Sequence, residues 1–191
     1  MPVEMKQMIA EQFARLLEEK RMEKITVKEL VSACRISRQT FYYHFQDTME
    51  VVEYLVEQHL KHSLERGREA ESPQEALKLV MSVTEQDVAL LKHLLASQRR
   101  DEVLAILISA SRDYIAQMIR AKAQGAAITV SDLEVAVNFY SYGFVGMMLA
   151  DLGKDLDLDL RADQIVRLIS GRMFPEPEKG RRDEKNGERN A

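Results

Sequence analysis

Apolar residues recur along most of the chain at intervals of three and four residues, the period of an α-helix. Almost no segment alternates apolar and polar positions as a half-buried strand does. The first apolar stripe consists of Met5, Ile9, Phe13, Leu16 and Leu17. It predicts an opening helix of about four turns. The pattern as a whole predicts an all-α protein.

Helix-start signals follow closely in the first quarter of the chain. Thr26 and Glu29 have the spacing of a capping box, in which the Thr26 hydroxyl accepts from the Glu29 amide and the Glu29 side chain reaches back. Ser37 is a second N-cap, and it opens a helix with Phe41 and Phe45 on its inner side. Two short helices separated by a turn of about three residues are therefore expected.

The remaining helices are longer. Further starts or spans are predicted at Asp47, at Pro73 after Ser72, from Thr84 to near Ser97, over 100–122 with a stop at Gln124–Ala126, over 132–152 from a capping box at Ser131, and over 162–174. Residues 175–191 carry five acids, five bases and no large apolar residue, so they are predicted to be disordered. We expect a head at 1–46, a helical domain at 47–174 and a charged tail at 175–191.

Composition narrows the class of protein. The 191 residues are 46% hydrophobic, and the lone Cys34 excludes an internal disulfide, which suits a cytoplasmic protein. No signal peptide is expected, because residues 1–20 carry acids and no continuous apolar core. Val135–Ala150 is the longest apolar run, but sixteen residues fall short of the roughly 20 that span a bilayer. We expect no membrane contact and interpret this run as a core or subunit-interface helix.

Residues 26–45 have the sequence form of a helix-turn-helix, with two capped helices joined by a short turn. With Phe41 and Phe45 inward, the polar residues of the second helix point outward. Arg and Gln side chains can read base edges in the major groove, and Thr, Tyr and His suit phosphate oxygens. A solvated amphipathic helix is the alternative. The caps, the turn length and the outward residue types together favour DNA binding.

The run ITVKELVSACRISRQTFYYHFQD resembles the TetR family of bacterial transcriptional regulators, and the likeness covers residues 9–56. The resemblance implies an all-helical homodimer with an N-terminal three-helix DNA-binding domain and a C-terminal domain that binds a ligand and dimerises. It implies phosphate contacts by Thr40, Tyr42 and His44, and positions near base edges or backbone for Lys28, Arg38, Gln39 and Tyr43. The expected DNA-binding residues are Thr26, Lys28, Ser37, Arg38, Gln39, Thr40, Tyr42, Tyr43 and His44.

The chain departs from the family pattern in two places. Arg35 stands where a turn glycine is usual, and a left-handed backbone there costs a non-glycine residue about 1 kcal/mol. Gln46 and Thr48 stand where lysine is favoured. Residues 1–48 hold eight bases against seven acids. With so little positive charge, affinity for an operator in double-stranded DNA is expected to require both heads of a dimer.

The dimer is expected to form through the helices near 132–152 and 162–174, with Gly143 and Gly146 allowing close backbone approach. The alternative is that helix 132–152 is only the core of the monomer. We expect a repressor whose long helix from Asp47 transmits the binding of an effector. The expected pocket residues are Met81, Tyr114, Met118, Phe139, Tyr140 and Phe144, although each could be plain core.

An enzyme and a protein-interaction module are the alternatives to a DNA-binding regulator. For an enzyme, the sequence lacks a phosphate-binding glycine loop and a nucleophile elbow, and His59 and His62 have too few partners to suggest a metal. No cofactor and no metal are therefore expected. The second is a helical protein-interaction module that has lost DNA binding. The FYYHF run also resembles activators of dihydroxyacetone-kinase genes, which take their signal from a protein partner instead of a small molecule.

Overall fold

The computed structural model describes residues 2–68, 70–86, 88–122 and 128–174, and every regular element in them is a helix. The elements are α1 (Pro2–Glu19), the 3-10 helix η1 (Met22–Lys24), α2 (Val27–Ala33), α3 (Arg38–His44), α4 (Thr48–Arg68), α5 (Pro73–Gln86), α6 (Val88–Leu95), α7 (Arg100–Lys122), α8 (Val130–Asp151) and α9 (Leu158–Ile169). The all-α prediction is confirmed.

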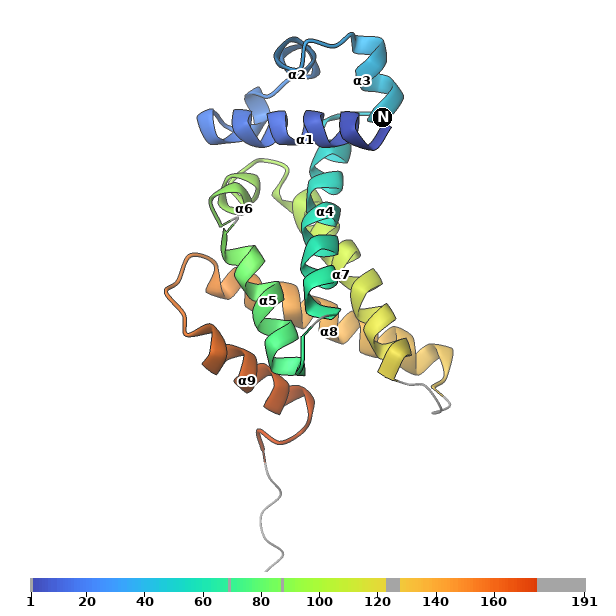
Figure 1. Ribbon diagram of the computed structural model, residues 1–191, viewed down its shortest axis with the longest axis vertical. Helices are drawn as coiled ribbons and strands as arrows, with labels where there is room; N and C mark the ends of the chain where they lie inside the picture. The colour runs from blue at the N-terminus through green and yellow to red at the C-terminus, as the bar shows by residue number, and fades with distance from the viewer. Residues whose placement is uncertain (1, 69, 87, 123–127, 175–191) are drawn as a thin grey trace, which may run out of the picture.

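The helices form two parts joined by α4. We call residues 2–45 the head and residues 48–174 the body. In Figure 1, α1, α2 and α3 lie together at one end of the molecule, and α4 runs from them into the body beside α7. In the body, α7 packs on α8, and α5 packs on both α4 and α9. A single helix therefore belongs to both parts.

Side-chain caps begin the short helices where the sequence predicts them. The Thr26 hydroxyl accepts from the Glu29 amide at 3.3 Å, and the Ser37 hydroxyl accepts from the Thr40 amide at 2.9 Å. Ahead of α4, an Asp47 carboxylate oxygen accepts from two backbone amides, at 2.7 and 3.1 Å. The prediction that the Glu29 side chain reaches back to complete the capping box is wrong. The Glu29 carboxylate instead pairs with Lys20, which ties α2 to the end of α1.

Three helix starts in the body differ from their predicted positions. Thr84 lies inside α5, and the next helix begins at Val88. Thr129, not Ser131, caps α8, since its hydroxyl accepts from the Asp132 amide at 3.1 Å. Asp157 caps α9, which spans Leu158–Ile169 instead of 162–174. At α8 the sequence offers two cap residues two positions apart, Thr129 and Ser131, and the helix begins after the earlier one.

Other helix ends agree with the prediction or lie beyond the structure. The span 100–122 is confirmed by α7, and Gly153, with a φ of +76°, follows the end of α8 as expected. The predicted stop at 124–126 and the predicted disordered tail at 175–191 lie outside the described residues.

The head and the upper body share one hydrophobic core. Phe13, Phe41 and Phe45 of the head are almost fully buried, and they belong to the same cluster as Leu94 of α6 and Val103 of α7. The cluster continues without interruption through apolar residues in the first turns of α4. The orientation of the head relative to the body is therefore held partly by ordinary core packing.

Helix α8 is apolar but mostly uncovered within one chain. It is long and apolar enough to cross a membrane by length and composition, yet only 17% of its apolar window is buried. Val137, Ser141 and Val145 are its buried positions, while Val135 and Phe139 are exposed. Burial in the monomer core therefore accounts for one face of α8 only.

One buried hydroxyl at the head–body junction has no hydrogen-bond partner among the described residues. It belongs to Tyr54, whose ring contacts Phe45 edge-on with a centroid distance of 5.8 Å and lies under the Lys6 ammonium. Burial raises the pKa of the Tyr54 phenol.

We expect Tyr54→Phe to leave the free energy of unfolding unchanged or to raise it by up to about 1 kcal/mol, because the ring stays and an unpaired buried hydroxyl is removed. Denaturant unfolding measures this, with Tyr42→Phe as a control at an exposed hydroxyl. A loss of stability confined to the Tyr54 variant would contradict the assignment.

Candidate nucleic-acid interface

The turn between α2 and α3 is a Schellman motif. The Ile36 amide donates to the Val31 carbonyl at 3.0 Å, and the Arg35 amide donates to the Ser32 carbonyl at 3.2 Å. Arg35 has a φ of +53° and is the only non-glycine residue with a positive φ in the described chain. The predicted left-handed turn at a non-glycine residue is confirmed.

The inner face of α3 is anchored by two phenylalanines. Phe41 is fully buried, and Phe45, which ends the helix, is buried to the same degree. Their rings lie 6.0 Å apart between centroids. Because a seven-residue helix has two turns, fixing these two side chains determines which side chains face outward.

The outward side chains of α3 and its cap form an exposed polar surface. Arg38 and Gln39 are exposed, Tyr42 is 58% exposed and Tyr43 is 80% exposed. None of these four side chains makes a hydrogen bond to another described residue. The Tyr42 ring contacts Phe41 edge-on, but most of each tyrosine side chain is open to solvent.

The other expected DNA-binding residues surround this surface. Thr26, Lys28 and Ser37 are exposed, while Thr40 and His44 are partly buried. The Ser37 and Thr40 hydroxyls are 2.8 Å apart, and His44 contacts the Tyr43 ring edge-on. The structure therefore brings all nine expected residues to α3, its cap and the start of α2.

Negative charge at the start of α4 is a feature that sequence analysis missed. Glu50 accepts from the Gln46 amide at 2.5 Å, and Asp47 caps the helix, so two carboxylates lie close to positions 46 and 48, where the family favours lysine. The signal was present in the spacing of Asp47 and Glu50, which we interpreted only as a helix start.

Cys34 ends α2 and is half-buried in the turn. Burial raises the pKa of its thiol, so the reactive thiolate is scarce near neutral pH. Cys34 is therefore better suited to packing in the turn than to redox chemistry.

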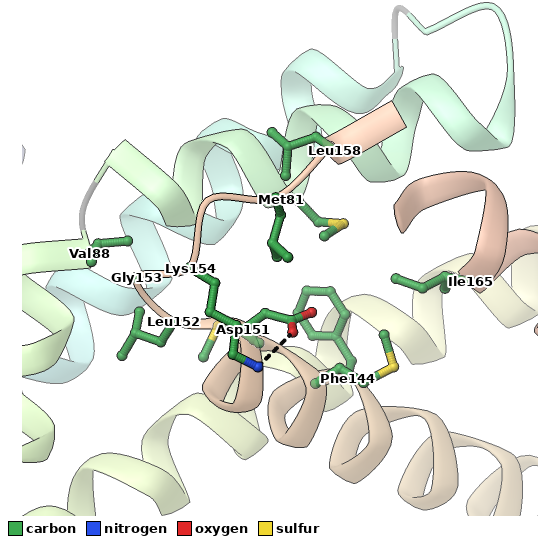
Figure 2. Close-up of a pocket in the computed structure, with 12 residues that line it drawn as sticks. Met81, Val88, Phe144, Asp151, Leu152, Gly153, Lys154, Leu158 and Ile165 are labelled. Atoms are coloured by element: carbon green, nitrogen blue, oxygen red, sulfur yellow. Dashed lines mark ion pairs between the residues drawn. The ribbon is translucent and has the colours of Figure 1, made fainter. Parts of the chain in front are cut away.

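The six expected pocket residues do not share one cavity. Met81 and Phe144 line a cavity of about 60 Å³ between α5, α8 and the start of α9 (Figure 2). Tyr114 lines a groove of about 350 Å³ between α4 and α7. Met118 and Phe139 are exposed, and neither they nor the partly buried Tyr140 line either space.

The first cavity has an ionic rim that the sequence did not reveal. Asp151 pairs with Lys154 at 3.6 Å and with Arg161 at 3.2 Å, and Figure 2 shows the first pair beside the Phe144 ring. The interior is otherwise apolar, with three methionines. Its volume admits a few water-sized groups.

The groove between α4 and α7 has an acidic rim, formed by Glu53, Glu57, Glu65 and Asp113. Burial, and secondarily the neighbouring Glu53, raises the pKa of the Glu57 carboxyl. Within the described residues no three His, Cys, Asp or Glu side chains are grouped as metal ligands, and the His59 ring lies 2.7 Å from the Leu55 carbonyl.

A capped helix-turn-helix that presents an exposed polar helix from a helical body defines the class of helix-turn-helix DNA-binding proteins. Comparison with known families agrees. The family described as "Bacterial regulatory proteins, tetR family" matches residues 9–55, and the "Transcriptional regulator C-terminal region" matches residues 71–169, more than half of the chain. The chain belongs to the TetR family. It is a DNA-binding transcriptional regulator and not an enzyme.

Solved structures share the whole fold at low sequence identity. The chain is similar to the dihydroxyacetone kinase operon activator DhaS, with 15% identity, 88% of this chain and 96% of that chain covered, and a TM-score of 0.62. A transcriptional regulator from Aquifex aeolicus VF5 is 18% identical, with coverage of 86% and 99% and a TM-score of 0.54. The fatty acid degradation regulator FadR from Bacillus halodurans is 16% identical, with coverage of 87% and 95% and a TM-score of 0.52. No curated protein matches the chain significantly.

The left-handed turn gives a stability test. Arg35→Gly removes the Cβ that is strained at positive φ, whereas Arg35→Ala removes the charge and keeps that Cβ. We therefore expect the glycine variant to be more stable than the alanine variant by about 1 kcal/mol in denaturant unfolding. Equal stability of the two variants would show that the turn relaxes to another conformation.

Proposed function

We propose that the protein is a repressor that binds an operator in double-stranded DNA as a two-fold homodimer, with α3 of each protomer in a major groove. The observation that carries this proposal is the outward face of α3, whose exposed Arg38, Gln39, Tyr42 and Tyr43 side chains have no hydrogen bond within the described chain. Family membership supports the DNA-binding role.

In this proposal the residues divide by reach and chemistry. Arg38 and Gln39, in the first turn of α3, read base edges, and Tyr43 lies beside them. Thr40, Tyr42 and His44 contact phosphates, which position the protein without specifying sequence. The DNA backbone is approached from the other side of the turn by Lys28, Thr26 and the Ser37 cap.

Charge limits the affinity of one head. Gln46 and Thr48 stand where a phosphate-facing lysine is usual, and the carboxylates of Asp47 and Glu50 lie beside them, so each head releases fewer counterions from DNA. Binding of both heads of a dimer compensates for the weak affinity of each one, because the second binding event is intramolecular. Their recognition helices must then lie about one DNA turn apart, roughly 34–36 Å.

The proposed dimer interface is the uncovered side of α8 with α9. Val135, Phe139 and Tyr142 follow helical spacing along α8, and all three are exposed. A Cβ added at Gly143 or Gly146 would meet no atom of the described residues within 4 Å, so none of them packs there. Helix α9 adds a second exposed apolar set, Leu160, Leu168 and Ile169.

Repression is proposed because occupying a promoter is enough for it, whereas activation requires a further contact with the transcription machinery. An effector in the body would act through α4, which belongs to both parts. Met81 and Phe144 in the first cavity, or Tyr114 in the groove, are the positions where it would bind. Met118, Phe139 and Tyr140 remain weaker pocket proposals, because they line neither space.

The second candidate is an activator signalled by a protein partner. Two observations favour it: the structural similarity to DhaS, which is described as an operon activator, and the small volume of the first cavity. In vitro transcription from a bound promoter separates the two functions, since a repressor lowers the transcript yield of the purified polymerase and an activator raises it.

Binding to DNA selected from a random pool tests the proposed roles. We expect Gln39→Ala to lose about 1–3 kcal/mol of discrimination at one base pair and Tyr42→Phe to weaken binding to every site similarly. Gln117→Ala, at an exposed position of α7, is the matched control. If the wild-type chain enriches no DNA sequence at low salt, the protein-interaction module becomes the better description.

The dimer has its own test in sedimentation. We expect the wild-type protein to be a dimer at micromolar concentration and Phe139→Glu to be a monomer, because the new charge would be buried without a partner. Met8→Glu, at an exposed apolar position of α1, is expected to remain a dimer. A monomeric wild-type protein would contradict the proposed interface.

A further inference from the structure

A carboxylate of the head binds the body at a point away from α4. Glu23 lies in η1, and its Oε1 atom accepts a hydrogen bond of 2.6 Å from the backbone amide of Gln98. Gln98 lies in the connection between α6 and α7, which Figure 1 shows just beneath the head. The contact joins residues that are 75 positions apart in the sequence.

The body supplies a donor that needs such a partner. The amides that precede and open a helix have no acceptor within that helix. Ser97 supplies one acceptor here, since its hydroxyl accepts from the Arg99 amide at 3.2 Å. The Glu23 carboxylate supplies the next, and its negative charge is favourable at the positive end of α7.

Electrostatics agrees with this geometry. The hydrogen bond from the Gln98 amide is the main cause that lowers the pKa of the Glu23 carboxyl, and Arg21, whose Nε lies 3.4 Å from Glu23 Oε2, contributes less. The charged form of Glu23 is therefore the one that the contact favours. It is present at neutral pH and lost only in acid.

The place of the contact gives it a mechanical consequence. The head is attached to the body through α4 and through the packing of α1 on α6. Glu23 adds an attachment to the start of α7, and α7 packs on both α4 and α8. An attachment beside the axis of α4 resists tilting of the head about that axis.

We propose that Glu23 is a positioning residue: its carboxylate binds the connection that leads into α7 and holds the head at one angle to the body. Resting on the proposed function, the contact sets the distance between the two recognition helices of a dimer, and therefore the half-site spacing that the protein accepts. Glu23 needs no contact with DNA for this role.

The first measurement needs neither DNA nor a known oligomeric state. Spin labels at Arg15→Cys in the head and Gln117→Cys in the body, in a Cys34→Ala background, report the head–body distance within one chain. Labelled chains are diluted with unlabelled protein so that each dimer carries at most one labelled chain. Arg15 and Gln117 are both exposed and lie outside the contact.

We expect a narrow distance distribution for the wild-type residue and a broad or shifted one for Glu23→Ala. Glu23→Gln keeps an oxygen acceptor, so its distance distribution is expected to be closer to that of the wild type than the Glu23→Ala distribution is. Glu19→Ala removes the same charge from an exposed position of α1, where the side chain has no hydrogen bond or ion pair among the described residues. Its distance distribution is expected to match the wild type. A Glu23→Ala distribution identical to the wild type, or an equal broadening by Glu19→Ala, overturns the proposal.

The second measurement selects operators in which two half-sites are separated by variable spacers. We expect the wild type to enrich one spacing and Glu23→Ala to accept spacers one base pair longer or shorter, with the ratio of their affinities reduced several-fold. Half-site sequence preference should not change, because α3 is untouched. An unchanged spacing preference in Glu23→Ala overturns the positioning role alone. Failure of the wild type to enrich any DNA overturns the proposed function. In that case the distance measurement still shows whether the Glu23 contact holds the head.

Discussion

Burial of Phe41 and Phe45 in the core of the head is the interaction on which the rest of the structure depends. Because α3 has only two turns, these two anchors fix its rotation about its own axis. Arg38, Gln39 and the tyrosine pair then face solvent, although tyrosines would otherwise be expected to pack. The same two rings lie beneath the start of α4, so the recognition surface and the helix that leads to the body share one support.

Much of the head could be predicted from sequence because its determinants are local. Thr26 and Ser37 act on amides three residues away, and Arg35 takes the backbone conformation that its place in the turn requires. The Lys20–Glu29 pair escaped prediction because it joins two helices whose relative placement no local pattern contains. The proposed site residues of α3 were assigned from their position on one short helix, where periodicity alone defines a face.

The body was harder to predict for a physical reason. Helix spans followed from periodicity, but adjacent cap residues such as Thr129 and Ser131 compete, and packing decides between them. A cavity depends on which helices meet, so side chains from three helices were grouped by chemistry, and only Met81 and Phe144 line the same cavity. The run Val135–Ala150 was interpreted as too short to span a bilayer, but α8 extends over 22 residues and is long enough to do so, and burial within one chain explains only one of its faces.

The core that runs without interruption from the head through α4 into α6 and α7 has a consequence for how this protein can vary. A module joined by a flexible linker can be exchanged between proteins, since each part unfolds independently. Here the packing partners of the head include Leu94 and Val103, so removing the body would expose apolar surface on what remains. A graft of this head onto another body would have to carry the facing side chains with it, and the chain should lose its structure in a single cooperative step.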